Sequence, residues 1–161
     1  MCKFYSAILM KNGDLKHNPW TSSHEDIIDQ FGIKDNGREN FIRVEFIPQN
    51  NNYIDVDNYV FNVDENSIPE WFTDELRETT VYKLKLIINS MIIKEDRLIV
   101  CGEPIILHNC KIKKLKHSLV YSMSGSSVVE SMSDSSVVKY MSDSSVVKSM
   151  YGSSVVKYKK Q

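Results

Sequence analysis

The chain has 161 residues and a formal net charge of −1, with 42% hydrophobic and 25% charged residues. This is an ordinary globular composition, and a domain of this length buries about 68–70% of its unfolded surface, so a core is possible without disulfides or metals. No stretch approaches the roughly 18 consecutive apolar residues of a membrane helix, which excludes a membrane-spanning helix, and we expect no membrane partner.

Charge is divided unevenly along the chain. Residues 1–100 carry 17 acidic and 11 basic side chains, whereas residues 101–161 carry 4 acidic and 9 basic ones. This polarity can support head-to-tail contact between copies, or a weak attraction of the basic tail to a polyanion. The positive excess is modest, so we do not expect nucleic acid to be the partner.

The cysteines indicate the compartment. Cys2, Cys101 and Cys110 make an odd number, which is not the pattern of a disulfide framework. The apolar run of residues 5–10 is too short for the core of a signal peptide. We therefore expect a reducing, cytoplasmic setting.

The first elements expected are a hairpin and a short helix. Residues 4–10 alternate weakly and meet Asn12-Gly13, a dipeptide favoured in tight hairpin turns, before residues 14–16 resume the strand. Ser22 and Glu25 then have the spacing of a capping box. The one-sided apolar stripe that follows ends at Gly32, which predicts a helix of two to three turns.

A strand is expected over residues 41–47, with Ile42, Val44 and Phe46 on its buried face. Residues 53–63 are predicted to be its partner strand. A second capping box, Ser67 to Glu70, precedes apolar residues at helical spacing up to residue 91, which predicts a helix of about 20 residues. Its β-branched end leads into a strand near residues 97–101.

The last third of the chain is a repeat. From residue 126 four nonapeptides follow in register, namely SSVVESMSD, SSVVKYMSD, SSVVKSMYG and SSVVKYKKQ. HSLVYSMSG, residues 117–125, is a fifth unit, and HNCKIKKLK, residues 108–116, is a degenerate sixth. A nine-residue unit holds one short strand and cannot bury a face alone, so equivalent units must stack.

The fold class predicted is therefore an α+β N-terminal domain, residues 1–97, followed by a C-terminal β-solenoid or β-roll of nine-residue repeats, residues 98–161. The clear repeats span residues 117–161, and the degenerate ones begin at residue 108. Ser131, Tyr140, Ser149 and Tyr158 alternate with a period of 18, which favours two units per coil.

The side chains of the repeat can point inward or outward in two alternative arrangements, which are the two solutions that the sequence allows. In a regular strand Val137, Lys139 and Met141 share one side, and a buried lysine ladder is too costly, so the second valine must point inward. The apolar stripe left outside would be an interface, made of Val128, Val137, Val146, Val155, Met132, Met141 and Met150. Alternatively, a bend at the lysine returns methionine to the core. We favour the bend, because a long exposed apolar ladder invites aggregation.

The cysteines and histidines are the candidate residues for a metal or catalytic site. Cys101, His108, Cys110 and His117 carry zinc ligands, but like residues are nine apart, so the repeat brings them into register without a metal. We expect no metal, and Cys110 as a small buried group in the place of valine. No motif places a base or an oxyanion hole beside a thiol, even if His24 approached Cys2 or Cys101, so neither catalytic residues nor a cofactor are expected.

Two clusters of charge remain. The acidic residues Asp55, Asp57, Asp64 and Glu65 lack the glycine and spacing of a calcium loop, so we interpret them as a solvated face. A basic cluster near the start of the repeats is a possible phosphate-binding site at the junction of the two domains. Its residues are Lys111, Lys113, Lys114, Lys116, His108 and His117.

The chain resembles a group of proteins found in bacterial phages and prophages. The resemblance rests on the run Gly/Asp-Ser-Ser-x-Val-x-x-Met, here residues 125–132 and its copies. It also rests on Arg43-Val44-Glu45-Phe46-Ile47-Pro48, Val63-Asp64-Glu65 and Pro69-Glu70-Trp71-Phe72. It implies a phage-encoded, non-enzymatic binding or assembly protein in the host cytoplasm, whose partner is a host protein or a second copy of itself. The alternative is a protein that binds a small molecule or nucleotide.

Overall fold

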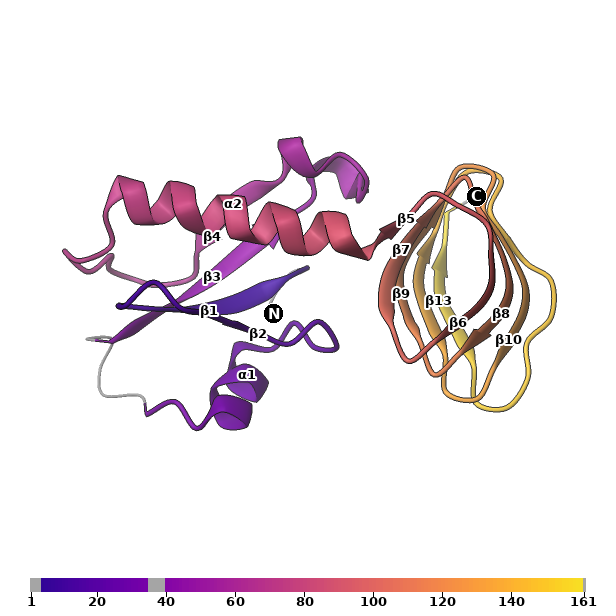
Figure 1. Ribbon diagram of the computed structural model, residues 1–161, viewed down its shortest axis with the longest axis horizontal. Helices are drawn as coiled ribbons and strands as arrows, with labels where there is room; N and C mark the ends of the chain where they lie inside the picture. The colour runs from indigo at the N-terminus through magenta and orange to yellow at the C-terminus, as the bar shows by residue number, and fades with distance from the viewer. Residues whose placement is uncertain (1–3, 35–39, 161) are drawn as a thin grey trace. The chain divides into compact units, whose positions relative to one another are not determined.

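The computed structural model describes residues 4–34 and 40–160, and the chain divides into two units, Met1–Ile88 and Asn89–Gln161. We call the first unit the head and the second the solenoid (Figure 1). The predicted class, an α+β domain followed by a β-solenoid, is confirmed. The units divide earlier than residue 97, because strands of the solenoid sheets already begin at Ile92.

The head contains an antiparallel sheet in the order β2-β1-β3-β4. Its strands are β1 (Ser6–Met10), β2 (Leu15–His17), β3 (Phe41–Ile47) and β4 (Val60–Val63). The predicted first hairpin is present, with Ala7 opposite His17 and Gly13 at a φ of 85° in its turn. In Figure 1 this sheet lies between two helices, α1 (His24–Phe31) and α2 (Asp74–Met91).

Both helices begin one or more residues away from their predicted caps. The Ser23 hydroxyl, not that of Ser22, accepts the N-terminal hydrogen bond of α1, from the Asp26 backbone at 3.2 Å. Helix α2 starts after Thr73, whose hydroxyl accepts from the Leu76 backbone at 3.2 Å. The capping box predicted at Ser67 is therefore wrong, since it lies before the helix.

Strand β3 is buried on both faces. The expected face of Ile42, Val44 and Phe46 is in the core, but Phe41 is buried as well and packs with Ile27 of α1. The prediction of one buried face was therefore incomplete, because the sheet is covered from both sides.

The partner strand predicted over residues 53–63 is shorter than expected. Two 3-10 turns, η1 (Gln49–Asn51) and η2 (Val56–Asn58), occupy the chain before β4. The buried Tyr59 hydroxyl donates to the Tyr53 carbonyl at 2.8 Å and closes this segment on itself. Aromatic residues of high strand propensity thus lie in a compact loop. Propensity alone does not distinguish such a loop from a strand.

The solenoid consists of two parallel sheets, in the orders β12-β10-β8-β6 and β13-β11-β9-β7-β5, which Figure 1 shows as stacked, flattened coils. Their strands are β5 (Ile92–Ile93), β6 (Arg97–Cys101), β7 (Pro104–His108), β8 (Lys111–Lys116), β9 (Leu119–Ser124), β10 (Val128–Ser133), β11 (Val137–Met141), β12 (Val146–Val147) and β13 (Val155–Lys159). Successive strands alternate between the sheets, so two units complete one coil, as the 18-residue alternation predicted.

The coils become shorter toward the N-terminal end of the solenoid. Paired residues are 18 positions apart in the perfect repeats, as in Val137 with Val155, and 17 apart for Val128 with Lys111. Arg97 pairs with Ile112, only 15 positions away, and Ile92 pairs with Ile106. The stack therefore extends beyond the recognisable repeats, into a region where shorter turns hide the period.

A bend directs the methionines of β9, β10 and β11 into the core. In β11 Val138 and Met141 point inward, while Lys139 and Tyr140 between them point outward. The pairing passes from Val138 directly to Tyr140, so the irregularity lies at the lysine. Of the two solutions that the sequence left open, the bend is the one adopted.

Each turn of the solenoid after β6 contains a residue in the left-handed region of φ. These residues recur every seven to nine positions and are Gly102, Asn109, His117, Gly125, Asp134, Asp143 and Gly152. The second serine after such a turn points inward, and its hydroxyl donates to a backbone carbonyl, as from Ser127 to Ser124 at 2.7 Å. The serines of the repeat thus satisfy the polar backbone of the turns.

Candidate binding face of the solenoid

Strand β8 carries four exposed lysines on the outside of its sheet. Ile112 and Leu115 point inward and are fully buried, whereas the remaining side chains of the strand are exposed. Those exposed side chains are Lys111, Lys113, Lys114 and Lys116. We call them, together with Leu98 and Ile99 of β6, the lysine face.

Only Lys111 among these lysines lies in an ion pair, although Lys113 also helps to lower the pKa of Glu130. Lys111 Nζ lies 2.8 Å from Glu130 Oε1, and this contact raises the pKa of Lys111 and lowers that of Glu130. Within the part of the chain that the structure describes, Lys113, Lys114 and Lys116 have no ion-pair partner. Three positive charges are therefore available to a ligand.

Apolar side chains accompany these charges. Leu98 is 74% and Ile99 59% exposed, and Ile99 pairs with Lys114 across the two strands. An open groove of about 390 Å³ lies beside them, lined by Asp96, Arg97, Leu98, Lys111, Lys113 and Glu130. Two exposed aliphatic residues among unpaired lysines suit a partner that is anionic and partly apolar.

The two histidines predicted for this site lie apart from each other. His108 precedes β8 and His117 follows it, so the length of a six-residue strand, about 20 Å, separates them. His117 Nε2 lies 3.6 Å from Asp134 Oδ2. The predicted six-residue site is therefore divided: the lysines share one face, and the histidines belong to opposite turns.

His108 contacts a serine hydroxyl, but in an orientation that does not activate it. Its Nδ1 lies 3.0 Å from Ser124 Oγ, and its Nε2 lies 2.8 Å from Asn109 Nδ2. The Asn109 oxygen accepts from the Ser126 backbone at 2.9 Å, which fixes the amide with its NH₂ toward His108. Nε2 is then an acceptor and Nδ1–H a donor to Ser124, so the ring cannot take the hydroxyl proton through Nδ1.

The residues predicted for an apolar interface also fall into two groups, one on the outside of the solenoid and one in its core. The first valines point outward, with Val146 and Val155 exposed and Val128 and Val137 half-buried. Including Met132 and Met141 in an interface was wrong, because Met132 is 0% exposed and Met141 is also buried in the core. Met150 is exposed.

The cysteines occupy different environments. Cys101 is exposed on β6, whereas Cys110 is buried, and this burial raises the pKa of its thiol. Cys110 stands at the inner serine position of the repeat, one residue before the valine position that we predicted, because Val128 pairs with Lys111. Among the described residues no three His, Cys, Asp or Glu side chains cluster as metal ligands, and Cys2 lies outside those residues.

The acidic residues of the head are not all solvated. Asp57 is exposed and lies 2.7 Å from Lys85. The Glu65 carboxylate is buried and accepts from both the backbone and the guanidinium of Arg43, each at 3.2 Å. Glu65 therefore ties the end of β4 to β3, and interpreting it as part of a solvated face was wrong.

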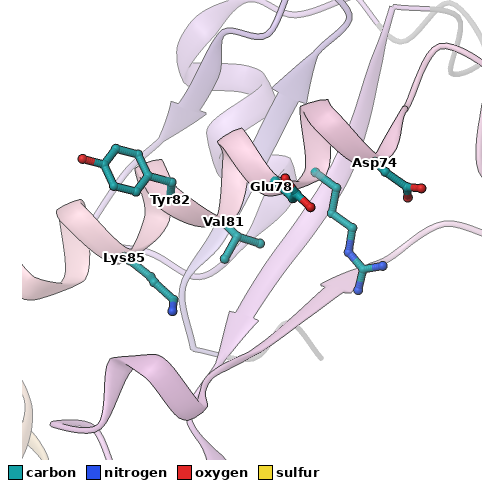
Figure 2. Close-up of a pocket in the computed structure, with 6 residues that line it drawn as sticks. Asp74, Glu78, Val81, Tyr82 and Lys85 are labelled. Carbon is teal, nitrogen blue, oxygen red and sulfur yellow. The ribbon is translucent and has the colours of Figure 1, made fainter.

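A second surface, on α2, was not predicted. A groove of about 520 Å³ is lined by residues of this helix, as Figure 2 shows, namely Asp74, Arg77, Glu78, Val81, Tyr82 and Lys85. Tyr82 is 63% and Leu86 53% exposed. The sequence held a signal for it, since these two apolar residues are four apart and outside the buried stripe of the predicted helix.

Comparison with protein-family models, with curated proteins and with solved structures finds no match to this chain. No helix among residues 4–34 and 40–160 has the length and apolar character needed to cross a bilayer. What the fold itself defines is a β-solenoid protein with an α+β head.

Proposed function

We propose that this chain is a non-enzymatic binding protein that recognises an acidic, partly apolar protein surface through the lysine face. The observation that carries the proposal is the presence of three lysines without acidic partners beside exposed Leu98 and Ile99. Lysines without acidic partners steer an anionic partner toward the sheet, and the aliphatic side chains supply surface to bury on contact.

The rigidity of the solenoid supports this proposal. The lysines project from strand β8, which is hydrogen-bonded on both sides, to β6 and to β10. The backbone positions of the lysines are therefore held at fixed spacing. A preorganised surface loses less conformational entropy on binding than a mobile loop does.

The resemblance to phage and prophage proteins supports a host-cell protein as the partner, in the host cytoplasm. Such a protein would be bound and not chemically altered. A basic surface of this kind selects partners by charge, and the aliphatic pair narrows the choice to surfaces with apolar residues among the acids.

A small anionic ligand such as a nucleotide is the second candidate. The groove beside Arg97, Lys111 and Lys113 favours it, because two of its lining side chains are lysines that can contact phosphate. Arg97 is already engaged by Glu95 at 2.8 Å and Lys111 by Glu130, and the charge of Lys113 also helps to lower the pKa of Glu130.

The test compares charge reversals on and off the face. Lys113→Glu with Lys114→Glu is matched by Lys157→Glu with Lys160→Glu, which changes charge equally at exposed positions in and directly after β13. Full-length protein captures host proteins, and captured acidic proteins are titrated at low and high salt. We expect the first variant to bind at least about tenfold more weakly and the control to bind as wild type.

Equal binding by both variants contradicts the proposal. Saturable nucleotide binding that Lys113→Glu removes favours the second candidate.

A further inference from the structure

We infer that the lysine face also binds a second copy of this chain, through the exposed face of α2. The inference rests on the proposed function of the lysine face and names one partner for it. We define the acidic helix face as Asp74, Glu75, Glu78, Tyr82 and Leu86, all exposed on α2 (Figure 2 shows three of them).

The acids of this helix face are available to a partner. Within the described parts of the chain, Asp74, Glu75 and Glu78 have no basic partner, and the nearby Arg77 lies over the Phe61 ring at 5.7 Å. Asp74 and Glu75 also stabilise the positive end of the helix dipole. Glu78 lies beyond the first turn, where that effect has faded.

The two faces are complementary in charge. The head carries 15 acidic and 9 basic residues, whereas the solenoid carries 6 acidic and 11 basic ones. On each face there are charges that lack an ion-pair partner among the described residues, at Glu78 and its neighbours on one side and at Lys113, Lys114 and Lys116 on the other. Opposite charges of this kind raise the rate of encounter and fix the register of a contact.

The faces also match in apolar content. Tyr82 and Leu86 give the helix an apolar half, as Leu98 and Ile99 do for the sheet. The aliphatic pair lies on β6, beside the lysines of β8, because Ile99 pairs with Lys114. A helix that crosses from β8 to β6 can therefore place its acidic half over the lysines and its apolar half over the aliphatic pair.

This contact joins different surfaces of two copies. If two copies exchange it reciprocally, they form a closed dimer, and if they do not, the contact repeats into an open chain of copies. In either case association depends on protein concentration and weakens with salt, because part of it is attraction between exposed charges.

The experiment is sedimentation velocity of the full chain across a wide range of concentration, at low and high salt. The variants are Glu75→Lys with Glu78→Lys on the helix, and Lys113→Glu with Lys114→Glu on the sheet. We expect wild type to associate, each variant alone to weaken association at least tenfold, and an equimolar mixture of the two variants to associate, since each supplies the face that the other has lost. Lys157→Glu with Lys160→Glu is the control and keeps wild-type association.

A wild-type chain that stays monomeric at every concentration overturns the inference but leaves the proposed function standing, because that function is judged by capture of acidic host proteins. A helix variant that associates as wild type, or a mixture of variants that fails to associate, also overturns it.

Discussion

Single residues of the turns determine how one coil fits on the next. Gly125 has a φ of 63°, and its missing side chain leaves room for its neighbours on both sides. A Cβ at this position would meet the Asn109 side-chain oxygen at 2.0 Å. From the other side, Asp143 accepts a hydrogen bond from the Gly125 backbone at 2.8 Å. The glycine between Asn109 and Asp143 in this column of turns therefore has a steric cause.

We expect Gly125→Ala to lower the free energy of unfolding of the solenoid by about 2–3 kcal/mol. Left-handed strain contributes about 1–2 kcal/mol, and loss of the Asn109 hydrogen bond to Ser126 contributes about 1 kcal/mol. Gly102→Ala is the matched control, since Gly102 has a φ of 71° but nothing within 4 Å of the added Cβ. Urea unfolding checks both, and similar losses in the two variants would show that the contact with Asn109 is unimportant.

In strands β10 and β11, two residues that point outward lie between two residues that point inward. Val129 and Met132 point inward in β10, and Val138 and Met141 do so in β11. A regular strand alternates strictly, so this three-residue step requires the irregularity at Glu130 or Lys139. The bend gives each nine-residue unit two core residues and lets its lysine remain outside.

Valine-to-threonine substitutions test this arrangement, because they preserve shape and add a hydroxyl. Val138→Thr places the hydroxyl in the core and should cost about 1–3 kcal/mol, whereas Val137→Thr faces outward and should cost less than about 0.5 kcal/mol. The difference between the two urea midpoints is the measurement. Equal midpoints would contradict the assigned direction of the strand.

Periodicity predicted the solenoid well, and it predicted the head less completely. Exact repeats identified β9 to β13, but β5 to β7 pair at intervals that shrink with the turns, so no fixed period reveals them. In the head, the aromatic residues Tyr53 and Tyr59 have strand propensity but pack in a loop. The lysines of the site were predicted because they are close in sequence, whereas Leu98 and Ile99 join them only through strand pairing.

At the scale of the whole solenoid, stability comes from contacts between neighbouring coils. Its core runs without interruption from Ile93 to Met141, with Val147 and Val156 packed against it. Each coil contacts only the coils before and after it, so the free energy of folding is approximately a sum over coils and their interfaces.

Removing one complete coil should therefore shorten the solenoid without unfolding it. Deletion of residues 126–143 joins Gly125 to Ser144, which reproduces the natural junction of Gly125 with Ser126. We expect a folded chain with a lower urea midpoint and with amide protection retained by the core strands. Deletion of residues 131–143 is the control. It is not a multiple of nine residues, so it should abolish protection in β12 and β13. A collapse of both variants would refute additive stacking.

The two-unit coil has a consequence for how such chains diverge. Recombination between nearly identical coding segments adds or removes whole units, and an odd change transfers every later strand to the opposite sheet. If the change falls between Tyr140 and Tyr158, whose rings stack at 5.3 Å, these two residues no longer share a face. An even change keeps every later strand on its own side and alters the stack by about 4.8 Å. Descendants that differ by pairs of units keep the same surfaces at a different length.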